Sequence, residues 1–102
     1  MTLAKFPKTL LVVVAEAALE RRLIADLRAR GAQGYTVSDV RGAGRHGSRE
    51  GVWEADRTIE LKVICDPAAA DRIAAHVMAA YGEHYHVALW MSEVSVLRPE
   101  QY

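Results

Sequence analysis

The spacing of hydrophobic positions divides the first half of the chain into strand-like and helix-like segments. Leu10 to Ala15 is an unbroken apolar run rich in valine, which is typical of a central strand. From Glu16 to Arg30 the leucines fall one turn apart and the run stops at Gly31, so the spacing predicts a helix. Gly34 to Gly42 is strand-like again, but its apolar positions change parity, which predicts a bulge or twist near Ser38.

The second half shows the same succession of patterns. Thr58 to Cys65 alternates between apolar and polar residues, as a strand with one buried face does. Asp66 and Pro67 suit an N-cap and a first helical residue, so a helix is predicted from there until Gly82. Its buried stripe is expected to consist of Ala70, Ile73, Ala74, Val77 and Tyr81. His86 to Leu97 is strand-like again.

The resulting order, β-α-β-β-α-β, predicts an α+β fold of the ferredoxin-like sandwich type, with both helices on one sheet face. A chain of 102 residues is expected to form a single domain, residues 1–102. The other sheet face has no helix to cover it. Glu60 and Lys62 would allow water to cover that face, whereas Tyr35, Leu89 and Trp90 favour a second subunit.

Composition narrows the classes of function. Lysine plus arginine equal aspartate plus glutamate at 13 each, so no bulk positive charge favours nucleic acid as a partner. The six-residue run Leu10 to Ala15 is too short to span a membrane, and no signal peptide precedes it, so we expect a cytoplasmic protein without direct membrane insertion. Cys65 is alone, which excludes an internal disulfide.

The segment between the second and third predicted strands, Ala43 to Asp56, is much longer than a hairpin needs. It is rich in glycine and holds Arg45, His46 and Arg49, so free N–H groups and guanidinium groups share one surface that suits an anion. A merely solvated loop fits the composition equally well, and the P-loop pattern is absent. Val52 and Trp53 either fold back onto the domain or, with Arg49, contact a partner protein.

The residues leading into this loop resemble a known family. Gly31 to Gly47 reads Gly-Ala-Gln-Gly-Tyr-Thr-Val-Ser-Asp-Val-Arg-Gly-Ala-Gly-Arg-His-Gly. This is similar to the PII signalling proteins, in which a Gly-aromatic-Thr-Val strand runs into a Gly-x-Gly-Arg loop base. The residues around Tyr35, together with Ala70 to Ala74 in the second helix, most resemble the carbon-associated branch, which includes regulators linked to bicarbonate uptake and carboxysomes.

The resemblance implies a homotrimer that binds adenine nucleotides in clefts between subunits. By motif position, the base and ribose would lie against Gly34, Tyr35 and Thr36. The phosphates would face the loop base, formed by Gly42, Gly44, Arg45 and His46. Of these, Gly44, Arg45 and His46 are also the candidates for binding bicarbonate.

A second phosphate-contacting loop of the family falls on Gly82, Glu83, His84 and Tyr85. Nitrogen-sensing members carry a lysine- and glycine-rich stretch there, whereas the Glu83 carboxylate would repel a third phosphate, which favours ADP or AMP over ATP. Arg98 resembles a family arginine that reaches phosphate across a subunit boundary; an ordinary surface arginine is the alternative.

Further expectations follow from the family comparison. The loop would switch between states to regulate a partner, either a membrane transporter or a carbon-fixation protein. The loop has no tyrosine to accept a uridylyl group, and Ser48 is a weak candidate for modification. The paired-cysteine tail of some carbon-branch members is also absent.

Other site types have less support. His84 and His86 could share a strand face, but two ligands are too few for a metal site, so no metal is expected. His76 is predicted to be exposed on the outer side of its helix. No catalytic arrangement is recognised, so an enzyme is not expected. The alternative function is an ACT-type effector domain, which shares the element order and binds amino acids at subunit interfaces.

Overall fold

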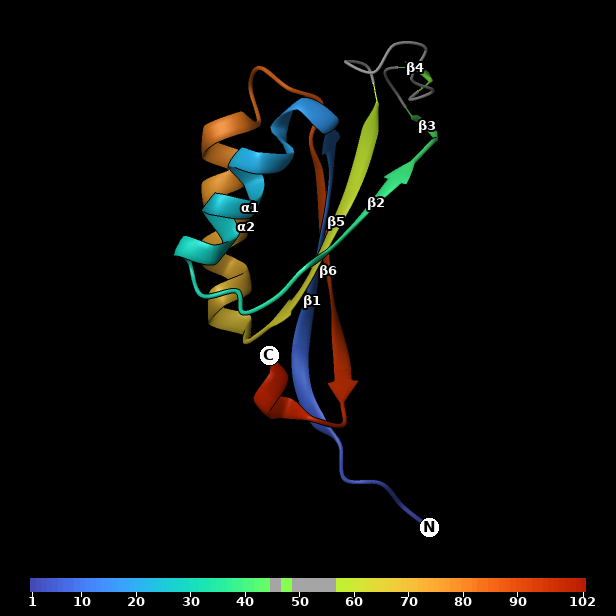
Figure 1. The fold of residues 1–102 in the computed structure, drawn as a ribbon, viewed down its shortest axis with the longest axis vertical. Helices are drawn as coiled ribbons and strands as arrows, with labels where there is room; N and C mark the ends of the chain where they lie inside the picture. Colours follow the sequence, from blue (N-terminus) through green and yellow to red (C-terminus); the bar gives the residue numbers. More distant parts are fainter. Residues whose placement is uncertain (45–46, 49–56) are drawn as a thin grey trace.

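The computed structural model describes residues 1–44, 47–48 and 57–102, which form a sheet with two α-helices packed against it (Figure 1). The long elements are β1 (Phe6–Glu16), α1 (Glu20–Ala29), β2 (Thr36–Val40), β5 (Thr58–Cys65), α2 (Pro67–Tyr81) and β6 (Ala88–Val96). The short ones are the 3-10 turns η1 (Ala17–Leu19) and η3 (Pro99–Gln101) and the strands β3 (Ala43–Gly44) and β4 (Gly47–Ser48).

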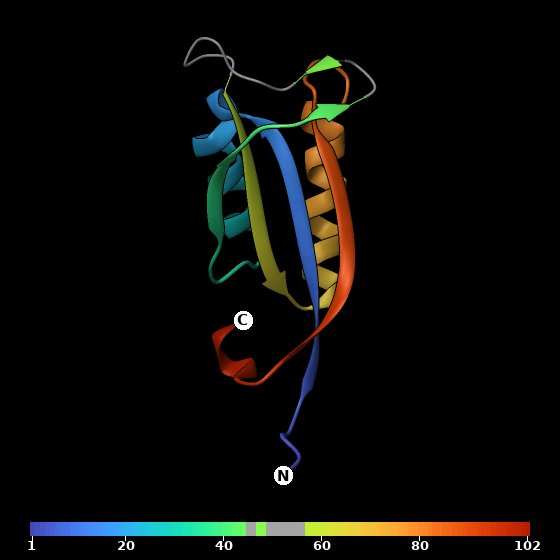
Figure 2. The same cartoon turned by 90° about the vertical axis from the view of Figure 1, so that its right-hand side faces the viewer.

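The sheet order is β2-β5-β1-β6, and each neighbouring pair is antiparallel. Figures 1 and 2 show α1 and α2 together on one side of this sheet. The order and the layering confirm the ferredoxin-like βαββαβ fold expected from the sequence. Within the described part of the chain, β2 and β6 each pair on one side, so they are the edges of the sheet.

The core lies between the two helices and the sheet face that they cover. It is formed by alternate strand residues and by the inward positions of both helices. Its members are Leu11, Val13, Ala15, Leu19, Leu23, Leu27, Ala32, Leu61, Val63, Cys65, Ala69, Ala70, Ile73, Ala74, Val77 and Tyr81. Burial, together with the Asp66 carboxylate, raises the pKa of the Cys65 thiol, in keeping with a packing residue rather than a reactive one.

The opposite sheet face, here called the uncovered face, carries the other set of strand residues. Val12 belongs to it by register, with Lys62 and Trp90 as its cross-strand partners. Half of the Trp90 side chain is exposed to solvent. Leu10, Val14, Ile64, Ala88 and Val94 lie on this face and are half-buried. An apolar face of this extent is typical of a surface that another subunit covers.

The structure corrects two predictions, one about an element boundary and one about strand geometry. Glu16 ends β1 instead of starting the first helix, and the chain enters α1 through η1. The predicted bulge near Ser38 is wrong, because the pairing of β2 with β5 runs without a break from Thr36–Lys62 to Val40–Thr58. The change of parity arises because Val37 packs against the core while Val40 lies on the other face.

Asp66 occupies the N-cap position of α2, but its carboxylate makes no capping hydrogen bond. Instead, Lys8 Nζ lies 2.7 Å from Asp66 Oδ1, which ties the beginning of α2 to β1. Pro67 follows at the first helical position, as predicted. At the base of the long loop, Ala43 pairs with Ser48 and Gly44 with Gly47.

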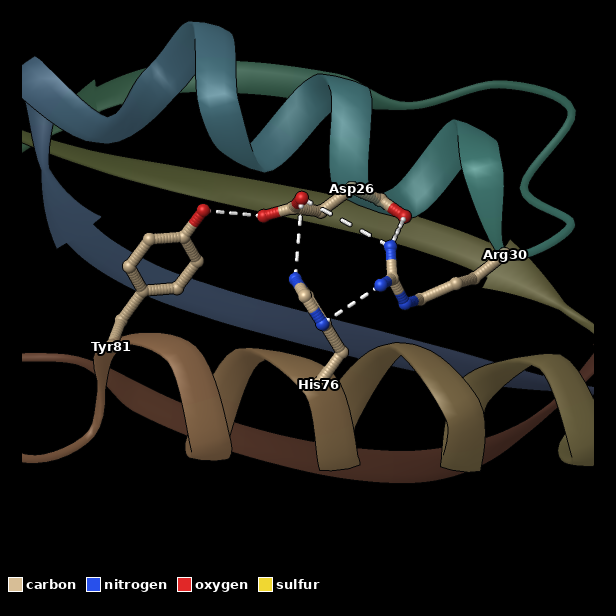
Figure 3. A network of polar contacts seen from close by, with 4 residues as sticks. All are labelled: Asp26, Arg30, His76 and Tyr81. Atoms are coloured by element: carbon tan, nitrogen blue, oxygen red, sulfur yellow. Dashed lines mark hydrogen bonds and ion pairs between the residues drawn. The ribbon is translucent and has the colours of Figure 1, made fainter.

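A polar network joins α1 to α2 on the outer side of the helix layer (Figure 3). The Asp26 carboxylate accepts a hydrogen bond from the Tyr81 hydroxyl and lies 3.2 Å from His76 Nε2. Arg30 Nη2 lies 2.8 Å from His76 Nδ1, and Arg30 Nη1 donates to the Asp26 carbonyl at 2.9 Å. The prediction that His76 is merely exposed was therefore wrong, because Asp26 of α1 and Arg30, directly after α1, supply partners to both ring nitrogens.

The turn after α1 depends on Gly31, whose φ of 107° is one that residues with a side chain rarely adopt. Gly31→Ala is expected to lower the free energy of unfolding by about 1 to 3 kcal/mol. Gly34→Ala is the matched control, since its φ is not positive and, its chain neighbours apart, no atom of the described residues lies within 4 Å of the added Cβ. Urea denaturation measures both variants, and equal stabilities would contradict the strain at Gly31.

Stability at alkaline pH should depend on Tyr81, because burial raises the pKa of its hydroxyl and the hydrogen bond to Asp26 raises that pKa further. A raised pKa stabilises the fold below the ordinary tyrosine pKa of about 10, and this contribution is lost as pH rises through the folded-state value. Tyr81→Phe should cost about 1 to 2 kcal/mol near neutral pH and lose less further stability above about pH 10.

Urea denaturation at several pH values checks this expectation, with Tyr35→Phe, an exposed tyrosine, as the control. A parallel decline of wild type and Tyr81→Phe in alkaline solution would contradict it.

Candidate functional site

A hollow of about 430 Å³ opens on the uncovered face beside the start of β2, and we call it the sheet-edge hollow. Its lining residues are Leu10, Gly34, Tyr35, Thr36, Lys62, Ile64, Gln101 and Tyr102. The register explains the floor, because Thr36 pairs with Lys62 and Leu10 pairs with Ile64 across three adjacent strands. The rim comes from the segment that precedes β2 and from the end of the chain.

The walls of the sheet-edge hollow combine aromatic, apolar and polar groups. The Arg28 guanidinium lies over the Tyr35 ring, 5.2 Å from its centroid, so α1 braces this side chain. Lys62 Nζ lies 3.1 Å from the Glu60 carboxylate, two residues earlier on the same strand face. The hollow therefore offers an apolar floor, aromatic rings and a few groups that hydrogen-bond, as sites for small organic molecules do.

A second hollow of about 300 Å³ lies at the other end of β2, where the long loop begins, and we call it the loop-base hollow. It is lined by Asp39, Val40, Arg41, Arg57 and Thr58. Arg57 Nε lies 3.9 Å from Asp39 Oδ1, and the Arg57 carbonyl accepts a 2.7 Å hydrogen bond from the Ala17 N–H. Two guanidinium groups and one carboxylate leave a net positive charge, which suits an anion.

The structure places some of the predicted site residues in these hollows and leaves others apart. Gly34, Tyr35 and Thr36 line the sheet-edge hollow together. Gly42 follows Arg41 directly, and Gly44 lies in β3. The remaining loop candidates, Arg45, His46, Arg49, Val52 and Trp53, lie outside the described residues.

The segment after α2 is partly exposed to solvent and partly packed against the core. Gly82, Glu83 and His84 are exposed, and His84 Nε2 lies 3.8 Å from a Glu83 carboxylate oxygen. Tyr85 is half-buried against the core, and its ring meets the Tyr81 ring edge-on with the centroids 5.9 Å apart. Tyr85 therefore has a packing role, and any contact with a ligand would come from its remaining exposed part.

Arg98 lies between β6 and η3, and Figure 1 shows the end of β6 and the C-terminal turn at the opposite end of the molecule from the connection between α2 and β6. Its Nε lies 3.7 Å from the Glu100 carboxylate, and its side chain is largely exposed. Arg98 does not line either hollow. Within one subunit, the predicted nucleotide residues are thus divided between two ends of the fold.

Sequence reasoning missed several lining residues. Arg41 and Arg57 lie on either side of the long loop in the sequence. They line the same hollow because the end of β2 pairs with the beginning of β5. Lys62 could have been predicted as a lining residue, because the alternation of its strand places it on the same sheet face as Thr36. Gln101 and Tyr102 carried no signal, because their position depends on the path of the chain after β6.

Two further observations concern the described part of the chain. Residues 1–44, 47–48 and 57–102 contain no cluster of three or more histidine, cysteine, aspartate or glutamate side chains able to hold a metal ion. Among the helices of these same ranges, none is long and apolar enough to cross a membrane.

Comparison with known proteins identifies the family. Residues 8–101 match the family model of nitrogen regulatory protein P-II. The chain also resembles a crystal structure of a PII-like signalling protein from Thermus thermophilus, with 35% identity and a TM-score of 0.85. That match covers 98% of this chain and 99% of the Thermus chain. Curated protein sequences include no match to this chain.

The fold is shared with more distant structures as well. The PII-like protein CPII from Thiomonas intermedia, bound to ADP, AMP and bicarbonate, has 21% identity and a TM-score of 0.88, over 98% of this chain and 97% of CPII. A second CPII structure, bound to ADP and bicarbonate, has a TM-score of 0.87 at 21% identity, over 98% of both chains. The resemblance drawn from Gly31 to Gly47 is confirmed: this chain belongs to the nitrogen regulatory protein P-II family.

Proposed function

We propose that this chain is a non-enzymatic signalling protein that binds adenine nucleotides between the subunits of a homotrimer. The observation that carries the proposal is the pair of hollows at the two ends of β2 in a P-II family chain. One hollow suits a base and the other suits an anion. The CPII structures, which share the fold, contain ADP and AMP, and this supports adenine nucleotides as the ligands.

The base and ribose would occupy the sheet-edge hollow. Leu10 and Ile64 offer an apolar floor for the base. The Thr36 hydroxyl and the backbone of Gly34 and Tyr35 offer hydrogen-bonding groups at the rim.

The phosphates would lie at the loop base. Arg41 and Arg57 supply positive charge there, and Gly42 and Gly44 allow close approach to backbone N–H groups. Arg45 and His46 follow in the chain and are proposed to complete this anion site. The same N–H groups and the Arg45 guanidinium could hold bicarbonate, which CPII binds together with ADP.

The distance along β2 favours a site that two subunits share. Thr36 and Val40, which line different hollows, are four residues apart on one strand, or about 13 Å. In a homotrimer assembled through the uncovered face, the sheet-edge hollow of one subunit would lie beside the loop base of its neighbour. Arg98, which reaches neither hollow of its own subunit, could then contact phosphate across the boundary.

Charge near the loop base bears on the number of phosphates. Residues 82–85 lie at the same end of the molecule as β3 and β4 (Figures 1 and 2). The exposed Glu83 carboxylate in this segment would repel a third phosphate, so ADP and AMP are proposed as ligands in preference to ATP.

The signalling output is proposed to pass through the long loop. Nucleotide, with or without bicarbonate, would shift the loop between two states, and Arg49, Val52 and Trp53 would contact the regulated partner. By analogy with the carbon-associated branch, that partner is a membrane transporter or a carbon-fixation protein, and the cytoplasm is the proposed location.

Calorimetric titration with AMP, ADP, ATP and cyclic AMP, each with and without bicarbonate, tests the ligand class. ADP or AMP should bind more tightly than ATP. Arg45→Ala should weaken binding about 10- to 100-fold, because it removes a charge-assisted hydrogen bond to phosphate.

Arg21→Ala is the matched control, since it removes an equal charge from an exposed position on α1. Unchanged binding by Arg45→Ala would reject the loop-base assignment. Failure of every adenine nucleotide to bind wild type would reject the proposed function, and binding of amino acids instead would favour the ACT-type alternative.

The homotrimer predicts a mass in solution about three times the 11.3 kDa of the chain. Trp90→Glu, which places a charge on the uncovered face, should shift the protein toward monomer. Met78→Glu should leave the trimer intact, because Met78 is an exposed apolar residue on α2, in the other layer. Light scattering coupled to size-exclusion chromatography gives the three masses, and a monomeric wild type would refute the assembly.

A further inference from the structure

The last residues of the chain form one wall of the sheet-edge hollow, although nothing in the family motif points to them. After β6 the chain turns through η3, where the Gln101 N–H donates to the Arg98 carbonyl at 3.1 Å and the Tyr102 N–H to the Pro99 carbonyl at 3.2 Å. Pro99 restricts the backbone at the start of this turn. The turn therefore directs Gln101 and Tyr102 back toward the hollow.

Two tyrosines line this hollow and come from distant parts of the chain. Tyr35 comes from the segment before β2 and is braced by the Arg28 guanidinium. Tyr102 comes from the end of the chain and is half-buried. Leu10 and Ile64 supply the apolar floor of the same hollow.

This combination has the chemistry of a base-binding pocket. Aromatic rings stack on the faces of bases, and this contact tolerates any base because each has a π-face. Discrimination requires an edge contact. A glutamine amide carries a donor and an acceptor, which match the N6 amino group and N7 of adenine, whereas guanine presents two acceptors at the same edge.

We propose that the C-terminal turn determines base recognition, with the Tyr102 ring stacking on the nucleotide base and the Gln101 amide hydrogen-bonding to its edge. This inference rests on the proposed nucleotide function and adds residues that the family pattern does not assign. The wall is supplied by the same subunit that supplies Tyr35 and Thr36.

The test compares full-length wild type, Tyr102→Ala, Tyr102→Phe and Gln101→Ala by calorimetric titration with adenosine, ADP and GDP. Tyr102→Ala should weaken the binding of adenosine and of ADP by a similar factor of about tenfold, because the ring stacks on the base, which both ligands share. Tyr102→Phe keeps the ring and should bind within about twofold of wild type. Gln101→Ala should reduce the preference for ADP over GDP about threefold or more.

Gln33→Ala is the matched control, because it removes the same amide from an exposed residue near the hollow that does not line it. It should leave affinity and base preference unchanged. A change of base preference in Gln101→Ala, at an unaltered thermal midpoint, is an effect that a purely structural role of the turn would not produce.

Three outcomes would overturn the inference while leaving the proposed function intact. The first is wild-type binding of ADP with no effect of Tyr102→Ala. The second is a loss of ADP affinity in Tyr102→Ala with adenosine affinity unchanged, which would indicate that Tyr102 contacts the phosphates. The third is an unchanged ADP to GDP ratio in Gln101→Ala. By contrast, wild type that binds neither adenosine nor ADP would reject the proposed function itself.

Discussion

The packing of α1 and α2 against a single face of the sheet is the interaction on which the other features of this chain depend. Leucines 19, 23 and 27, from η1 and α1, and the apolar stripe of α2 meet one set of strand residues and exclude water from them. Antiparallel strands alternate their side chains, so the other set must point away from the helices. The core of this subunit and the apolar face left for an assembly therefore have one origin.

The same arrangement positions the candidate site at an edge of the sheet. Among the described strands β2 pairs with β5 alone, and its two ends continue into the turn after α1 and into the long loop. The turn at Gly31 brings Gly34 to Thr36 to one end, and the loop leaves from the other. A small strand thereby separates a hollow with aromatic walls from a hollow with arginines.

Much of the fold could be predicted from local pattern, because each element carries its own period. The alternation in Thr58 to Cys65, the stripe of α2 and the stop at Gly31 all appear in the structure. Errors arose where a neighbour in space decided the outcome. His76 lies off the apolar stripe and was predicted to be exposed, yet Asp26 of α1 and Arg30, which follows α1, provide its partners. Asp66 looked like a cap, yet Lys8 binds its carboxylate.

For the candidate site too, some residues could be predicted from local sequence and others only from the folded chain. Local sequence was enough to define the strand-and-loop motif from Gly31 to Gly44, and with it the family and the residues Gly34, Tyr35 and Thr36, because these neighbours share one short stretch of backbone. The folded chain was needed to show that Lys62, Gln101 and Tyr102 share a hollow with them, and that Arg41 and Arg57 share another. Strand register and the return of the chain after β6 create these contacts, and both depend on burial of the whole core rather than on any local pattern.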